Sequence, residues 1–252
     1  MTGFETFGRE HLLWLFLLSA AGALVYRCLP DGNRPEAVSP PDGKPRTARR
    51  VLLAAALLPV LGRVLPGLYE IRKGSYGLAS LPLHVCSMAG YGCLLHFLLT
   101  EIYPAGSGKG TARQALSELL FFPGLPGAGL ALLFPGWGWC APFSFLSICE
   151  FLGHWGIVLY VLLRIRDGGI RPSPKRAWIP ILFCAGYICM MLPFDRMTGM
   201  NYGFLLLPAP DSPLSGIAGV AGNGAGYYAG YVLLLLGLMA ACYAPFRSRR
   251  EK

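Results

Sequence analysis

Long apolar runs are the feature that most constrains this chain. A helix needs about 20 mostly apolar residues to cross the hydrocarbon core of a membrane, and the sequence holds seven such runs. They lie at approximately 11–28, 51–71, 81–100, 115–134, 142–163, 178–194 and 226–245. With 54% hydrophobic and 14% charged residues, the chain has too little polar surface for a water-soluble protein of this size. We therefore expect an all-α polytopic protein of the cell membrane, a bundle of about seven transmembrane helices in one integral membrane domain over residues 1–252.

The distribution of lysine and arginine predicts the orientation of these helices. Basic residues accumulate in cytoplasmic loops. With the N-terminus outside, 17 of the 22 fall in predicted inner segments and 4 in outer segments, while Arg63 lies within the second run. Adding or removing one helix breaks this alternation. We therefore expect an outer N-terminus and a cytoplasmic C-terminus, and we interpret the net charge of +9 as a topology signal, with no nucleic-acid partner.

Two connections and one apolar run differ from a plain series of helices. Residues 30–49, rich in Pro, Gly and charge, are predicted to form a cytoplasmic linker loop. Residues 195–224 form the longest outer loop and are a candidate lid. The fourth run contains FFPGLPG, where Pro123 removes a backbone donor and Gly124 loosens the chain. We expect this helix to be interrupted, either to offer polar backbone groups to a cavity or as a packing kink.

Ionisable side chains inside a membrane are costly, so each is a candidate functional residue. Glu150 and His154 are four residues apart and share one helix face, where the carboxylate can orient the imidazole. Arg63 requires an anionic partner, for which the sequence offers Glu118, Glu150 or a lipid phosphate. The full set of such residues is Arg63, Glu70, His84, His96, Glu118, Glu150 and His154.

The third run begins LPLHVC, which places His84 and Cys86 two residues apart. On a helix they would point about 200° apart, unless the helix starts later. A thiol becomes nucleophilic only beside a base or a positive charge, and His154 is the better candidate base for Cys86. The alternative is that Cys86 is a small packing residue and His154 a helix-packing hydrogen bonder. The eight cysteines contain no CxxC pair, and no spacing favours a bound metal.

Five stretches of the sequence carry a resemblance to a known family. They are FGREH (7–11), LPLHVC (81–86), FFPGLPGAGLALLFP (121–135), FLGHWGIVLY (151–160) and NYGFLLLP (201–208). In this order they resemble the bacterial YwaF-like membrane proteins and the animal transmembrane protein 164 acyltransferases. Trp155 stands where the bacterial proteins usually have Gly.

The resemblance implies transfer of a fatty acyl chain between phospholipids. Cys86 would accept the acyl chain as a thioester, and His154, oriented by Glu150, would act as its base. Phospholipids and lysophospholipids would be the partners, without a soluble cofactor. The remaining candidate substrate-binding residues are Arg63, His84, Glu118, Pro123, Gly124, Asn201 and Tyr202.

The alternatives are a lipid hydrolase with the same Cys and His, a small-molecule transporter or binding protein, and a structural membrane protein. Under the predicted topology Cys86 lies about two helical turns nearer the outer face than His154. Because a base must reach its proton, the catalytic hypothesis requires this separation to close.

Overall fold

The structure is a computed structural model that describes residues 3–28, 46–102, 110–222 and 224–247. Throughout these ranges every regular element is helical. Six helices are long and apolar enough to cross a membrane, and α3 is apolar but shorter. In chain order the seven are α1 (Arg9–Cys28), α2 (Arg46–Lys73), α3 (Val85–Ile102), the α4–α5 helix (Gly110–Leu133), α6 (Phe145–Arg166), α7 (Trp178–Thr198) and α9 (Ala225–Tyr243). The predicted polytopic bundle is confirmed.

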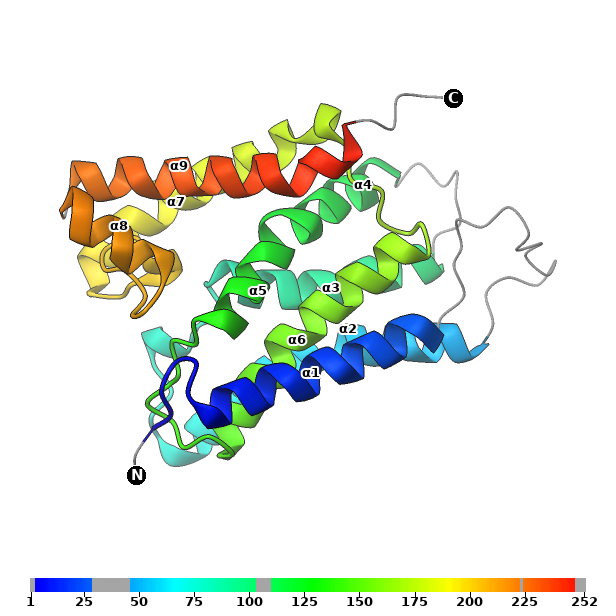
Figure 1. Ribbon diagram of the computed structural model, residues 1–252, viewed down its shortest axis with the longest axis horizontal. Coiled ribbons are helices and arrows are strands. Elements are labelled where there is room, and N and C mark those ends of the chain that lie inside the picture. The colour runs from blue at the N-terminus through cyan, green and yellow to red at the C-terminus, as the bar shows by residue number, and fades with distance from the viewer. Residues whose placement is uncertain (1–2, 29–45, 103–109, 223, 248–252) are drawn as a thin grey trace.

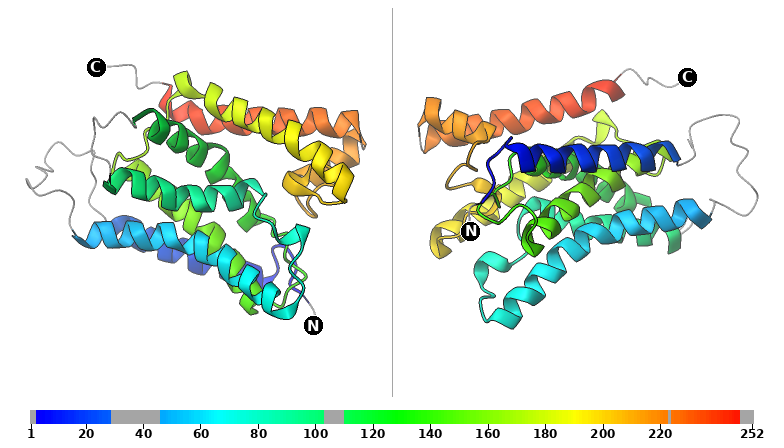
Figure 2. Two further views of the ribbon diagram at one scale, coloured as in Figure 1. Left: turned by 180° about the vertical axis from the view of Figure 1, so that it is seen from behind. Right: turned by 60° about the horizontal axis from the view of Figure 1, so that its bottom comes forward.

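Successive long helices run in opposite directions. Figures 1 and 2 show α7, α8 (Pro213–Ala221) and α9 on one side of the bundle, α1, α2 and α6 on the other, and α3 and α4–α5 between them. Helices α1 and α9 begin at the same end of the molecule. We call this the outer end and the opposite one the inner end. Which of them faces the cytoplasm remains the prediction made from the basic residues.

The fourth membrane helix is interrupted, as predicted. Helices α4 (Gly110–Leu119) and α5 (Leu125–Leu133) are separated by a single π-turn, η2 (Leu120–Gly124). Within it Phe122 has extended dihedral angles, φ −145° and ψ 124°, because a following proline disfavours the helical conformation. All five η2 residues are buried. The irregular backbone therefore lies inside protein, where it is tolerated at membrane depth.

The two predicted connections differ from expectation in extent. Of the linker at 30–49, residues 30–45 lie outside the described residues, and residues 46–49 are helical because α2 begins at Arg46. Of the outer loop at 195–224, α7 continues to Thr198 and α8 occupies Pro213–Ala221. Helix α8 is only nine residues long, too short for a search based on membrane-spanning runs. Short 3₁₀ turns complete the described chain at η1 (Leu78–Ser80), η3 (Pro174–Arg176), η4 (Tyr202–Phe204) and η5 (Ala244–Phe246).

Helix α3 begins later than the third apolar run. Residues 81–84 are not helical, and α3 starts at Val85. At 1.5 Å per residue, the 28 residues of α2 span about 42 Å, whereas the 18 of α3 span about 27 Å. The chain therefore returns from the far end of α2 through residues 74–84 before α3 starts (Figure 1). Cys86 lies in the first turn of a helix whose start is set back from the end of α2.

Glycines bring α2 and α6 into close contact. A Cβ added at Gly62 would lie 2.8 Å from the Gly153 Cα and 2.7 Å from the Cys149 carbonyl oxygen. At Gly156 it would lie 2.7 Å from the Leu58 Cβ. Small residues at such positions let helix backbones approach closely in membranes. This approach places Arg63, next to Gly62, beside the face of α6 that carries the Glu–His pair.

Candidate active site

Cys86 and His154 meet between α3 and α6. Cys86 is partly exposed, and His154 is buried about two turns into its helix. The thiol and the imidazole are near neighbours, close enough for their side chains to interact electrostatically. The expected separation of two helical turns is therefore wrong. The set-back start of α3 brings its first turn level with the middle of α6, and a thiol and a base stand side by side.

The contacts of His154 assign its tautomer. Its Nδ1 lies 2.8 Å from the backbone oxygen of Glu150. A carbonyl oxygen can only accept, so Nδ1 carries the hydrogen and Nε2 is left to take the proton of Cys86. The Glu150 carboxylate is farther away, with Oε2 3.6 Å from Nδ1. The imidazole is thus oriented mainly by a backbone carbonyl, whereas the sequence predicted the side-chain carboxylate in this role.

Arg63 pairs with Glu150. The guanidinium Nη1 donates to Glu150 Oε1 at 2.6 Å, and both side chains are largely buried. Of the partners that the sequence left open for Arg63, the structure contains Glu150 and not Glu118. The pair keeps a carboxylate beside His154 while balancing its charge, which reduces the cost of holding both groups in the membrane.

His84 lies beside this group, immediately before α3. Because it is outside the helix, the 200° separation from Cys86 does not apply. The backbone N–H of Gly203 donates to Nδ1 at 3.4 Å. The hydrogen of the neutral ring is therefore on Nε2, which makes His84 a hydrogen-bond donor close to Cys86 in sequence.

The NYGF segment packs over His84. The Tyr202 ring lies 5.0 Å from the His84 ring, edge to face, and its hydroxyl donates to the backbone oxygen of Leu78. Gly203 has a left-handed φ of +65°, and a Cβ there would lie 2.9 Å from the ring of Tyr187. Only glycine fits this turn without strain. Tyr202 thus contacts a site residue, whereas Asn201 bonds to its own loop through Leu206 and Leu207.

Trp137 is a site residue that sequence reasoning missed. Its ring stacks on the His154 imidazole, with centroids 5.0 Å apart and planes at 17°. It is buried although it lies in a loop, and the aromatic GWGWC segment is the signal that the sequence offered. Its neighbours Gly136 and Gly138 line a cavity of about 650 Å³ near the outer end, together with the N-terminal segment and Asp211. Because these two glycines flank Trp137 in the chain, the cavity lies close to the ring that covers His154.

Pro123 and Gly124 lie behind α3 and make no polar contact with the site. A Cβ at Gly124 would lie 3.2 Å from that of Ala89, which is one turn beyond Cys86. In the structure the broken helix therefore packs against the helix that carries the thiol, which agrees with a packing kink. Tyr187, another residue not predicted, donates its hydroxyl to the backbone oxygen of Leu83 at 3.0 Å and so holds the segment leading into α3.

Glu118 belongs to a different group, which we call the inner cluster. This carboxylate is fully buried and accepts from Arg176 Nε at 2.7 Å, Tyr243 hydroxyl at 2.6 Å and Ser173 N–H at 3.2 Å. None of these partners contacts Cys86 or His154. Glu118, predicted as a substrate-binding residue, therefore lies apart from Cys86 and His154 in this structure, with its carboxylate bonded within the inner cluster. Within the described residues, no group of three or more His, Cys, Asp or Glu side chains is placed to hold a metal ion.

A family model matches the chain over residues 6–243, which is nearly its whole length. The chain belongs to the TMEM164 family. This confirms the TMEM164 part of the resemblance, and the YwaF-like part stays a prediction. No curated protein and no solved structure matches the chain in the two other comparisons. In this TMEM164 family member the FGREH segment is structural, because buried His11 accepts from the Phe7 N–H at 2.9 Å and binds the Leu132 backbone oxygen at 2.8 Å.

Proposed function

We propose that this TMEM164 family member is a membrane acyltransferase that moves a fatty acyl chain between phospholipids through a Cys86 thioester. The observation that carries the proposal is the proximity of the Cys86 thiol to His154, whose Nδ1 is held by a backbone carbonyl. A nucleophile, a base and a group that orients the base are the parts that covalent catalysis needs. Membership of the family and the membrane fold are compatible with this activity.

In the first half-reaction His154 Nε2 takes the proton of Cys86, and the thiolate attacks the ester carbonyl of a donor phospholipid. The carbonyl oxygen carries negative charge in the tetrahedral intermediate, and we assign the Nε2–H of His84 to stabilise it. The C–O bond then breaks, and the proton on His154 passes to the leaving lysophospholipid. The acyl chain remains on Cys86 as a thioester.

In the second half-reaction His154 takes the proton of the acceptor lysophospholipid's hydroxyl. The alkoxide attacks the thioester, the C–S bond breaks, and the thiolate regains the proton from His154. The Arg63–Glu150 pair stabilises the imidazolium formed in each half-reaction, because Glu150 lies beside Nδ1. The cavity of about 650 Å³ near Trp137 offers the headgroups a route from the outer end.

The test uses purified protein in liposomes, with a phospholipid labelled in its acyl chain, with and without a lysophospholipid acceptor. We expect labelled phospholipid from the acceptor, and an acyl adduct on Cys86 that mass spectrometry detects and hydroxylamine removes. Cys86→Ala should abolish both, while Cys184→Ala, a partly buried cysteine of α7, should keep them. Free fatty acid as the sole product would establish a hydrolase in place of the transferase. Turnover that survives Cys86→Ala would exclude covalent catalysis at this thiol.

A further inference from the structure

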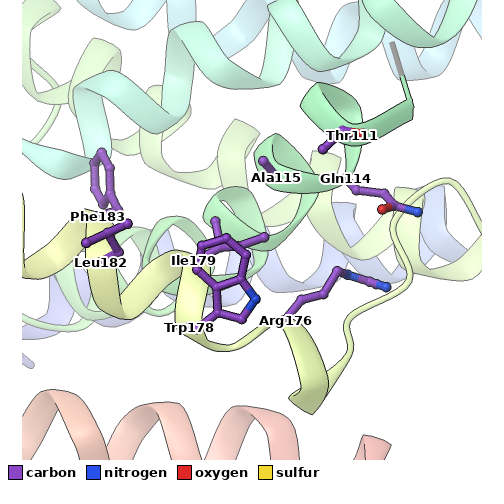
Figure 3. Close-up of a pocket in the computed structure, with 8 residues that line it drawn as sticks. All are labelled: Thr111, Gln114, Ala115, Arg176, Trp178, Ile179, Leu182 and Phe183. Atoms are coloured by element: carbon purple, nitrogen blue, oxygen red, sulfur yellow. The ribbon is translucent and has the colours of Figure 1, made fainter. Parts of the chain in front are cut away.

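A second concave site lies at the inner end, between α4 and α7. It has a volume of about 420 Å³, within the range of small-ligand pockets. Figure 3 shows Gln114 and Arg176 together at one end of the groove and Leu182 and Phe183 at the other. The rest of the lining is Thr111, Ala115, Trp178 and Ile179. The groove is thus polar at one end and apolar along its length.

The polar end is built on a fixed guanidinium. Arg176 donates through Nε to the buried Glu118 and through Nη2 to the backbone oxygen of Arg171 at 2.6 Å. Its Nη1 donates no hydrogen bond within the part of the chain that the structure describes. The side chain is held in place before any ligand binds, so little rotamer entropy is lost when an anion is added. Helices α4 and α7 both begin at this end, and their N-terminal dipoles favour the same sign of ligand charge.

The charges around the groove are not balanced. Glu118 neutralises Arg176, but Arg113 on α4 and Arg171 form no ion pair among the described residues. Arg171 donates only to the Gly168 backbone oxygen at 3.1 Å. Neither arginine lines the groove, but Arg113 directly precedes Gln114 and the Arg171 backbone oxygen accepts a hydrogen bond from Arg176, so two positive charges remain near the polar end. An anionic headgroup complements these charges, whereas a zwitterionic headgroup also carries a positive group, which they would repel.

The exposed side chains along the groove indicate that it faces the lipid of the membrane. Trp178 is 61% exposed and Leu182 66% exposed, on a helix whose surface faces mostly outward. A tryptophan at the end of a membrane helix is typical of the level of the lipid headgroups. The apolar end lies deeper, at the level of the acyl chains. A ligand with a phosphate at the headgroup level and a hydrocarbon tail below it matches both ends.

We propose that the α4–α7 groove binds one anionic phospholipid, with its phosphate at Arg176 Nη1 and Gln114 and one acyl chain along Ile179, Leu182 and Phe183. This site lies by the inner cluster and does not include Cys86 or His154. Binding needs no reaction at Cys86, so the site is independent of the proposed acyl transfer. If no phospholipid bound at this groove, the acyl-transfer proposal would be unaffected.

The test is native mass spectrometry of the detergent-solubilised protein, titrated with dioleoyl phosphatidylglycerol or dioleoyl phosphatidylcholine. We expect one phosphatidylglycerol to bind more tightly than any phosphatidylcholine, by about an order of magnitude, because the charges of Arg113 and Arg171 near the polar end are not compensated by an ion pair within the described ranges. Arg113→Gln and Arg171→Gln should each reduce the preference about fivefold. Cys86→Ser should bind as the unchanged protein does. Glycerol 3-phosphate, which has the phosphate without the chains, should not compete at matched concentration.

A matched pair of substitutions tests the apolar end. Leu182→Trp fills the groove and should remove the tight phosphatidylglycerol site, while Ile181→Trp, 46% exposed on the same helix but outside the lining, should keep it. Thermal unfolding checks that both variants are folded. Equal affinity for the two lipids, or equal binding by the two tryptophan variants, would overturn the proposal. Competition by glycerol 3-phosphate would also overturn it, because the site would then recognise phosphate without a lipid.

Discussion

The two ends of the molecule each hold an arginine–carboxylate pair, yet the pairs are embedded differently. Near the outer end, Arg63 and Glu150 are 2.6 Å apart, and at the inner end Arg176 and Glu118 are 2.7 Å apart. The carboxylate of Glu118 accepts hydrogen bonds from three donors and is fully buried. Glu150 has one donor on its side chain and a histidine next to it. The difference is that the outer pair borders a group able to exchange a proton.

This comparison teaches that an ion pair inside a membrane does not mark a reactive site by itself. Both pairs satisfy the requirement that a buried charge be compensated. Only the outer one lies beside a thiol and an imidazole that are near neighbours. We therefore expect changes at the outer group to alter reaction rate more than stability, and changes in the inner cluster to do the opposite.

Among the variants that keep the Cys86 thiol, the largest effect should come from His154→Ala. Loss of the base should lower the rate of acyl transfer by about 10²- to 10⁴-fold, the usual contribution of general base catalysis. The measurement is the initial rate with labelled phospholipid and acceptor. A matched control is His96→Gln, because His96 is also buried but bonds to Tyr160 and Ser117 away from Cys86. A similar loss of rate per folded molecule in both variants would contradict the division between the two regions.

Glu118→Gln should have the next largest effect, and on stability. It leaves the Arg176 guanidinium without a countercharge at a largely buried site, which we expect to cost about 2–3 kcal/mol. The rate per folded molecule should not change. Unfolding in a denaturing detergent measures the difference. Glu101→Gln serves as the control, because its partner Arg49 is 60% exposed and such pairs contribute less than about 1 kcal/mol.

Sequence reasoning recovered the membrane helices because hydropathy depends on runs of about 20 residues, and it recovered the break at Pro123 because proline acts locally. It also selected Cys86, His154 and Glu150. The proximity of the first two could not be predicted, since it depends on where α3 starts relative to α6. That start is set by the connection at residues 74–84, which carries no apolar periodicity.

The contact partners of these side chains could not be predicted from the sequence either. Arg63 had two carboxylates available, and the close approach of Gly62 to Gly153 decides for Glu150. The position of Glu118 in the inner cluster could not be predicted, because its contact with Tyr243, 125 residues later, has no local signal. Trp137 was missed because stacking on His154 depends on how a loop folds back over α6. Each of these facts is a property of packing between distant segments.

Glu150→Gln should have a smaller effect on rate than His154→Ala. The backbone carbonyl of Glu150 still holds Nδ1, so the imidazole keeps its tautomer and its direction. What is lost is the negative charge that stabilises the imidazolium, and we expect a fall in rate of roughly tenfold. The pH profile of the rate is the second readout. Loss of the Glu150 charge should shift the pH at which protonation of the His154 imidazole lowers the rate. A loss as large as that of His154→Ala would mean that the carboxylate, and not the carbonyl, orients the base.

The smallest effects should come from one chemical change made at both ends. Tyr243→Phe removes a donor from Glu118, and Tyr187→Phe removes the hydroxyl that binds the Leu83 backbone oxygen. Each loses one hydrogen bond, so we expect each to lower the free energy of unfolding by about 1–2 kcal/mol. Only Tyr187→Phe should also slow acyl transfer, by a few-fold, because Leu83 immediately precedes His84 and the turn that carries Cys86. Equal rates in the two variants would show that the entry to α3 is positioned without Tyr187, and a slower rate for Tyr243→Phe would show that the inner cluster communicates with the thiol.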